Sequence, residues 1–209
     1  MTTGAKAEAM ALKTTSLGAS FQEASGRLFS RLPLSANQIT VCALFLAFIG
    51  FYFAYAQQPL VSLLFFILSG ATDAIDGAVA RARKEVSARG AYIDGMIDRL
   101  VEFLFACSFF FYALPPFLLP VGAWIICFLF FGSCMTSFAT AYADHRKVAD
   151  AKKIARQPGI FPRAERLILL FIALALVPFC PTCTSFLLFA GAVLAAITFK
   201  QRFIYFAAK

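Results

Sequence analysis

The residues best suited to chemistry are four aspartates between positions 73 and 98 of a chain that is 61% hydrophobic. Asp73 and Asp76 lie three positions apart, and Asp94 and Asp98 lie four positions apart. Spacings of three and four place side chains on the same face of a helix, so each pair is expected to project together. Carboxylates at the ends of apolar helices are costly and therefore mark a functional site by default.

The charge of these four carboxylates predicts bound divalent cations. The basic segment 83–89 is short, so the helices on either side of it are expected to run antiparallel and bring the two pairs together. Facing carboxylates repel one another strongly at low dielectric, and hard oxygen ligands favour Mg²⁺, Mn²⁺ or Ca²⁺. Two ions about 4 Å apart would match the ligand count and suit the transfer of a phosphoryl group. The alternative is that the acids only pair with local Arg and Lys side chains.

The residues beside the acids suit a phosphate. Gly77 and Ala80 leave the backbone open, so that a phosphate or a nucleotide could approach it closely. Arg81 offers a planar guanidinium fork of the kind that binds phosphate oxygens. The segment therefore predicts a metal site that handles phosphate groups.

The elements that must position this site are membrane helices. Only 14% of the residues are charged and 26 are Phe, which is typical of a polytopic membrane protein. We predict an all-α protein whose six transmembrane helices, each near the roughly 20 residues that a bilayer requires, cover 38–56, 60–82, 90–113, 117–143, 164–179 and 183–201. An amphipathic interfacial helix is predicted at 16–32. The domains are then a cytoplasmic N-terminus, 1–37, and a transmembrane domain, 38–209.

The distribution of charge predicts the orientation of these helices. The connections 57–59, 114–116 and 180–183 contain no charged residue, whereas the segments on the opposite side are rich in Lys and Arg. The positive-inside rule then places both termini and the acidic segment in the cytoplasm. We therefore expect a multi-pass protein of the cell membrane with its site at the cytoplasmic face. The net charge of +8 is explained by this distribution and does not indicate a nucleic-acid partner.

The acidic segment resembles the signature of the CDP-alcohol phosphotransferase family. The pattern D-x2-D-G-x2-A-R-x8-G-x3-D-x3-D is matched at every position, by Asp73, Asp76, Gly77, Ala80, Arg81, Gly90, Asp94 and Asp98. The resemblance implies a transferase of phospholipid biosynthesis in which an alcohol attacks the β-phosphorus of a CDP-linked donor and CMP leaves. It also implies two divalent cations, Mg²⁺ or Mn²⁺, and a CDP-activated lipid whose tails remain in the bilayer.

The same resemblance implies a role for each residue of the motif. Asp73, Asp76 and Asp94 would bind metal, while Asp98 would act as general base and also contact the second ion. Gly77 and Gly90 would leave room for the cytidine, and Asp73, Ala80 and Arg81 would complete the nucleotide site. Asn37 and Thr40, at the start of the first predicted span, match the family as further nucleotide contacts, although a helix cap explains this short match equally well.

The acceptor alcohol is predicted from a second resemblance. Arg163-Ala-Glu165-Arg166 is similar to the R-x-E-R element of phosphatidylinositol phosphate synthases and their archaeal counterparts, whose acceptor is inositol 1-phosphate. A cationic pocket would suit that phosphate, with Arg146, Lys147, Arg163 and Arg166 as its candidates. At 141–145 the chain departs from this subgroup. An alternative explanation of these bases is topology and contact with anionic lipids.

Other acceptors and another class of function remain open. Glycerol 3-phosphate, serine or the hydroxyl of another lipid would use the same chemistry. A divalent-cation transporter would also carry acidic residues, but it should show charge on both sides of the membrane and polar residues at its centre. Here the charge lies on one side, which favours an enzyme at the interface.

Three further features give weaker signals. Cys180 and Cys183 have the spacing of a redox pair but lack a thioredoxin-like context. Glu102, one turn after Asp98, could extend the acidic face, but pairing with Arg99 or with a neighbouring helix is the simpler interpretation. The resemblance also implies a homodimer, for which the Phe-rich runs offer a contact surface.

Overall fold

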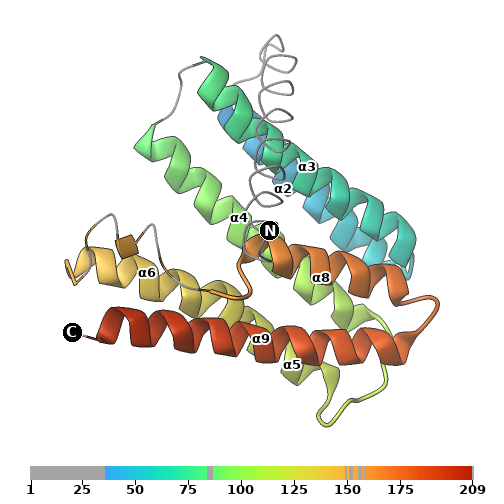
Figure 1. Cartoon of the computed structure of the whole chain (residues 1–209). Helices are drawn as coiled ribbons and strands as arrows, with labels where there is room; N and C mark the ends of the chain where they lie inside the picture. Colours follow the sequence, from blue (N-terminus) through green and yellow to red (C-terminus); the bar gives the residue numbers. More distant parts are fainter. Residues whose placement is uncertain are drawn as a thin grey trace, which may run out of the picture. The chain divides into compact units, whose positions relative to one another are not determined.

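The computed structural model describes residues 36–83, 87–148, 150, 153–154, 157 and 159–208, and this part of the chain is built from helices (Figure 1). Within these residues the only β-type pairing is an isolated bridge between Phe117 and Leu119. The predicted amphipathic helix at 16–32 lies outside the described residues. The elements are α2 (Ala36–Tyr55), α3 (Pro59–Arg83), α4 (Ala88–Ser108), η1 (Phe109–Phe111), α5 (Val121–Cys127), η2 (Phe128–Met135), α6 (Thr136–His145), α8 (Arg163–Leu176) and α9 (Pro181–Ala207).

Local sequence explains where α2 ends and where α3 begins. After α2, Gln57 adopts a left-handed φ of 59°. The amide of Gln58 donates to the carbonyl of Phe53 at 2.9 Å, which closes the helix in the manner of a Schellman motif. Pro59 then opens α3, where its missing N–H costs nothing. The uncharged connection 57–59 is therefore a tight turn between two apolar helices.

The predicted fourth span is a composite helix in the structure. It comprises α5, the π-helix η2 and α6, which follow one another without a break from Val121 to His145. The hydroxyl of Thr136, the first residue of α6, donates to the carbonyl of Gly132 in η2. After α6, Lys147 takes a left-handed φ of 55°, and the amide of Val148 donates to the carbonyl of Ala143 at 3.0 Å. These features end the helix two residues after the predicted boundary, at His145.

The chain forms two compact units. The first unit consists of Met1–Leu46 and Leu68–Asp98, and the second of Ala47–Ile67 and Arg99–Lys209. In the described part of the first unit, α2 and α3 are joined by the hydroxyl of Ser69, which donates to the carbonyl of Ala43 at 2.7 Å. Ser69 is fully buried, so this bond forms away from solvent and fixes the relation of the two helices.

The second unit is organised around α9. This helix, red in Figure 1, packs against α8 and against the successive segments α5, η2 and α6. Its core-facing residues are small or apolar, among them Leu188, Ala192 and Ala195, and they are buried. The rings of Phe66 and Phe105 stack with their centroids 4.2 Å apart elsewhere in this unit. Small residues on α9 allow its neighbours to approach closely, as is common between membrane helices.

Three helical segments of the described chain are long and apolar enough to cross a membrane. They are Gln38–Tyr55, Val121–His145 and Pro181–Ala207, and Pro59–Asp73 is a shorter apolar helix. The predicted spans 60–82, 90–113 and 164–179 also form helices, as α3, α4 and α8. The first two carry the charges of the acidic segment, and α8 has only 14 residues. The described residues are therefore helical, as predicted, and three of their helical segments have the length and composition of membrane spans.

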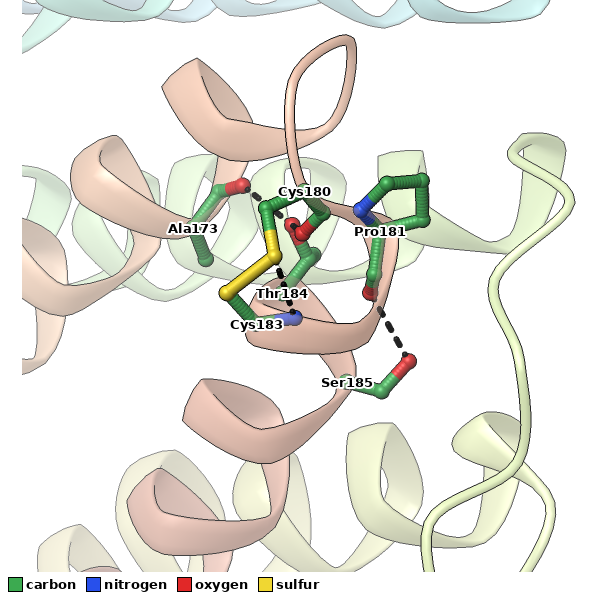
Figure 2. The surroundings of a disulfide bond; sticks show 6 residues. All are labelled: Ala173, Cys180, Pro181, Cys183, Thr184 and Ser185. Atoms are coloured by element: carbon green, nitrogen blue, oxygen red, sulfur yellow. Dashed lines mark hydrogen bonds between the residues drawn. A yellow bond between two sulfur atoms is a disulfide. The ribbon is translucent and has the colours of Figure 1, made fainter.

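A disulfide bond joins the end of the connection between α8 and α9 to the first turn of α9 (Figure 2). Cys180 and Cys183 are joined, with their Cα atoms 5.3 Å apart. The sulfur of Cys180 also accepts the amide hydrogen of Cys183 at 3.3 Å, so it caps the first turn of α9. Next to it, the hydroxyl of Thr184 donates to the carbonyl of Ala173 in α8 at 3.0 Å. The two helices are thus fastened together at this end.

Candidate active site

Three of the four motif carboxylates come together in the first unit. Asp73 from α3 and Asp94 and Asp98 from α4 each offer a carboxylate oxygen, and these three oxygens lie within 4.8 Å of one another. All three side chains are half-buried, so the oxygens can be reached while still partly shielded from water. Clustered carboxylates are the donors that Mg²⁺ and Mn²⁺ prefer, and the donor set therefore fits a divalent cation.

The start of α4 is fixed by a side-chain cap. The amide of Gly90 donates to the hydroxyl of Ser87 at 3.0 Å, which is the bond that an N-terminal serine cap makes. Counting from this cap, Asp94 lies in the second turn of α4 and Asp98 lies one turn later. The four-residue spacing places both carboxylates on one face of α4, and their oxygens lie near that of Asp73.

The remaining motif positions are placed by the backbone alone. Asp76, Gly77, Ala80 and Arg81 belong to α3, but their side chains lie outside the described residues. Asn37 is in the first turn of α2, and its side chain is likewise outside the description. Thr40 is buried one turn further along α2, and Gly90 is half-buried. The predicted nucleotide contacts among these residues stay predictions.

The four bases predicted to hold an acceptor phosphate have different surroundings. Arg146 is exposed, stacks over the ring of Tyr142 at 5.1 Å and donates to its hydroxyl at 2.9 Å. Lys147 is exposed directly after α6, and Arg163 is half-buried at the start of α8. The structure therefore places these three at the ends of helices in the second unit.

Arg166 lies in the interior of the second unit. It is 2% exposed, and its guanidinium faces the carboxylate of Glu102, which is fully buried. Nε donates to Oε1 at 2.5 Å and Nη2 to Oε2 at 3.1 Å. The pairing of Glu102 with a neighbouring helix was one of the two simpler sequence interpretations, and the structure selects it over pairing with Arg99. Glu102 does not extend the acidic cluster.

An open cavity in the second unit is lined by two arginines that the sequence analysis did not single out for binding. Its volume is about 450 Å³, and it is lined by Arg99, Ser137, Thr140, Ala141, Asp144, Ile154, Gln157 and Arg202. Nε of Arg99 donates to the hydroxyl of Ser137 at 2.9 Å. Nη1 of Arg202 donates to the carbonyl of Thr136 at 3.1 Å. The adjacency of Arg99 to Asp98 was the one signal in the sequence that could have identified this wall.

Comparison with known proteins assigns the chain to a family. Residues 34–199 match the CDP-alcohol phosphatidyltransferase family model. Archaetidylinositol phosphate synthase of Pyrococcus horikoshii is 31% identical over 86% of this chain and 87% of its own. CDP-diacylglycerol–glycerol-3-phosphate 3-phosphatidyltransferase of Haemophilus influenzae is 34% identical over 25% of this chain and 29% of its own.

A solved structure shares the fold. Phosphatidylinositol phosphate synthase of Mycobacterium tuberculosis with CDP-DAG bound has a TM-score of 0.75 and 20% identity, over 90% of this chain and 94% of that one. The same enzyme in complex with manganese and citrate has a TM-score of 0.74, over 90% and 89% of the two chains. The sequence signature, the gathered carboxylates and the match over most of the chain lead to one conclusion: this protein belongs to the CDP-alcohol phosphatidyltransferase family.

Proposed function

We propose that this CDP-alcohol phosphatidyltransferase moves a phosphatidyl-type group from a CDP-activated lipid to a hydroxyl of inositol 1-phosphate. The donor would be CDP-diacylglycerol or CDP-archaeol, and CMP would be released. The convergence of Asp73, Asp94 and Asp98 is the observation that carries the proposal, because the chemistry of the family needs hard ligands at the diphosphate. The relatives named as synthases of inositol phosphate lipids support the choice of acceptor.

The residues of the acidic motif divide the work. Asp73, Asp76, Asp94 and Asp98 would hold two divalent cations, Mg²⁺ or Mn²⁺. When bound, such cations neutralise a diphosphate and stabilise the negative charge that develops on departing CMP. Asp98 would accept the proton of the acceptor hydroxyl while the hydroxyl oxygen bonds to the β-phosphorus and the bond from that phosphorus to CMP breaks. Gly77, Ala80, Arg81, Gly90, Asn37 and Thr40 would complete the nucleotide site.

The cavity of about 450 Å³ is the proposed acceptor site. Its volume lies within the roughly 300–1,000 Å³ that small-molecule sites occupy. Arg99 and Arg202 would face the phosphate with planar forks, and Asp144 and Gln157 would accept hydrogen bonds from hydroxyl groups of the ring. Arg146, Lys147 and Arg163 stay in the proposal as charges that attract the anionic acceptor. Arg166 is removed from the list of phosphate ligands because its guanidinium faces Glu102.

The membrane arrangement is part of the proposal. Six spans would correspond to α2, α3, α4, α5 to α6, α8 and α9, with 38–209 as the transmembrane domain and 1–37 as the cytoplasmic N-terminus. The uncharged connections at 57–59, 114–116 and 180–183 support placing both termini and the active site at the cytoplasmic face of the cell membrane. A homodimer is also proposed, and mass determination in detergent would test it.

Glycerol 3-phosphate is the second candidate acceptor. The short match to the Haemophilus influenzae enzyme favours it, and its phosphate would suit the same two arginines. Serine carries no phosphate for Arg99 and Arg202 to bind, which makes it a weaker candidate. A divalent-cation transporter is the remaining alternative, and it would release no CMP.

The decisive experiment supplies each acceptor separately. Purified protein is incubated with CDP-diacylglycerol or CDP-archaeol and Mg²⁺ or Mn²⁺, together with inositol 1-phosphate, glycerol 3-phosphate, inositol or serine, and CMP is measured. Release of CMP with inositol 1-phosphate and a lipid product of matching mass supports the proposal. If CMP is released only with another acceptor, that acceptor replaces inositol 1-phosphate in the proposal. If CMP is released with none of them, the transporter is favoured. The variant Asp98→Asn is the blank, because it removes the proposed base.

A further inference from the structure

We infer that Glu102 and Arg166 are positioning residues, which hold the chain segment before α8 in the shape that the acceptor cavity requires. The segment is Gln157 together with Gly159, Ile160, Phe161 and Pro162, and it is called the α8 approach below. This inference rests on the proposed acceptor site, but its structural part can be tested without any acceptor. It assigns Arg166 a purpose other than binding phosphate.

The first step is that all three guanidinium nitrogens of Arg166 donate to protein acceptors. Two of its nitrogens bind the two carboxylate oxygens of Glu102, at 2.5 and 3.1 Å. Its third nitrogen, Nη1, donates to the carbonyl of Phe161 at 3.4 Å. The pair is almost fully buried, and removing one member of such a pair leaves an uncompensated charge in the interior. A phosphate would have to displace Glu102 from this fork, which makes Arg166 unsuitable as a phosphate ligand.

The second step is the anchoring of the α8 approach to α9. The amide of Ile160 donates to the side chain of Gln201 at 3.2 Å, and the amide of Phe161 donates to the hydroxyl of Thr198 at 3.1 Å. Phe161 and Thr198 are buried. The backbone of Phe161 is therefore held at both of its polar groups, by Thr198 of α9 at the N–H and by Arg166 at the carbonyl.

The third step connects the α8 approach to the cavity. Gln157 lines the cavity, and its side-chain oxygen accepts a hydrogen bond from the hydroxyl of Thr140. Gly159 packs so closely that an added Cβ would lie 3.0 Å from Thr198 and 3.6 Å from Nη2 of Arg202. A displacement of Phe161 would therefore also displace Gln157 and Arg202, which are both part of the cavity wall.

The fourth step is the shape of η2, which makes room for Arg166. A Cβ at Gly132 would lie 3.0 Å from Cδ of Arg166 and 3.3 Å from Cβ of Ala195. Gly132 is therefore a point of close approach at which only a hydrogen fits without displacement. The buried pair, the π-helix and the α8 approach form one packed arrangement. This arrangement fixes the positions of Gln157 and Arg202 in the cavity wall.

The test replaces the buried pair with apolar side chains of similar size, in the double variant E102L/R166M. Such replacements often preserve stability, because no unpaired charge is left behind. They also remove the donor to the carbonyl of Phe161. The positioning role predicts a rise in the KM for the acceptor on the order of tenfold or more, as displaced contacts typically cause. The KM for the CDP-lipid should stay unchanged, and hydrogen exchange at the amides of Ile160 and Phe161 should accelerate.

The matched control is T184V, which deletes another buried hydrogen bond between α9 and α8, the one from Thr184 to the carbonyl of Ala173. It should leave both KM values and the exchange of Phe161 unchanged. Wild-type acceptor KM and a protected Phe161 amide in the double variant would overturn the inference. If CMP is released with none of the four acceptors, the proposed function is wrong. The positioning role of the pair would still be tested by hydrogen exchange, because that measurement needs no acceptor.

The unaltered protein supplies a test that does not depend on whether a variant folds. If the pair positions the α8 approach, the amide of Phe161 is already protected from exchange without acceptor, and inositol 1-phosphate adds little. If Arg166 instead binds phosphate, this amide exchanges rapidly without acceptor and becomes protected only when inositol 1-phosphate is added. The second result would overturn the inference.

Discussion

Nε of Arg99 donates a hydrogen bond to the hydroxyl of Ser137 at 2.9 Å and so ties α4 to α6 at the residue that follows Asp98 in the chain. Arg99 also lines the open cavity of the second unit. The same helix thus supplies a carboxylate to the acidic cluster and, at the next residue, a cation to the cavity wall.

Replacing Arg202 or Arg99 with Ala should impair acceptor binding. A hydrogen bond to a charged group contributes about 1.5–3 kcal/mol, so the KM for inositol 1-phosphate should rise roughly 10- to 100-fold. The KM for the CDP-lipid should change little, and steady-state kinetics with each substrate varied in turn would measure both. The exposed Arg146, changed to Ala, is the matched control and should have a smaller effect that disappears at high salt. An equal effect of all three changes would contradict the assignment of the cavity.

Changing Asp98 to Asn should remove the general base while keeping the size of the side chain. The rate of CMP release should fall by about 10²- to 10⁴-fold, the usual contribution of such a group. Binding of the CDP-lipid, followed by calorimetry, should persist. Asp150, an exposed carboxylate that accepts the amide hydrogen of Lys153, gives the control variant Asp150→Asn, which should stay fully active. Normal activity of Asp98→Asn would eliminate its proposed role.

Removal of divalent cations with a chelator should abolish CMP release, and Mg²⁺ or Mn²⁺ should restore it. The reason is that the gathered oxygens of Asp73, Asp94 and Asp98 repel one another without a cation and cannot neutralise a diphosphate. Titration calorimetry should detect cation uptake in the wild type and weaker uptake in Asp73→Asn. Full activity after exhaustive chelation would refute the metal site.

Changing Gly132 to Ala should destabilise the second unit. The new Cβ would lie 3.0 Å from Cδ of Arg166, and overpacking of this kind costs about 1–3 kcal/mol. Gly95 in α4 is the matched control, since an added Cβ there meets nothing within 4 Å. Gly95→Ala should be neutral or stabilising by up to about 1 kcal/mol. Thermal unfolding in detergent would distinguish them, and equal melting temperatures would contradict the packing around Arg166.

Replacing Cys180 and Cys183 with Ser should lower thermal stability without changing the KM values. The disulfide closes a very short loop, for which chain entropy predicts about 2 kcal/mol. Thermal unfolding with and without a reductant would measure the loss. A reductant should have no further effect on the double Ser variant. A large drop in the rate of CMP release at ambient temperature would instead indicate a role for this pair in catalysis.

The sequence determined the local part of this protein. The spacing of Asp73, Asp94 and Asp98 predicted which faces of two helices carry the acids, because a helix repeats every 3.6 residues whatever it packs against. Apolar runs located the helices, and the fixed spacers of the motif indicated the family that the comparisons confirmed. The boundaries differed by a few residues, as in the span predicted at 117–143, which runs from Val121 to His145, and the π-helix inside that span was not predicted.

Only the tertiary structure decided which residues meet across long separations. Glu102 and Arg166 are 64 positions apart, and nothing in either local segment identifies the other as its partner. The cavity likewise draws its wall from α4, α6, the connection before α8, and α9. The physical reason is that periodicity fixes the direction of a side chain within its own helix, whereas partners depend on how helices pack. Arg166 therefore looked like a phosphate ligand in the sequence and became a buried partner of Glu102 in the fold.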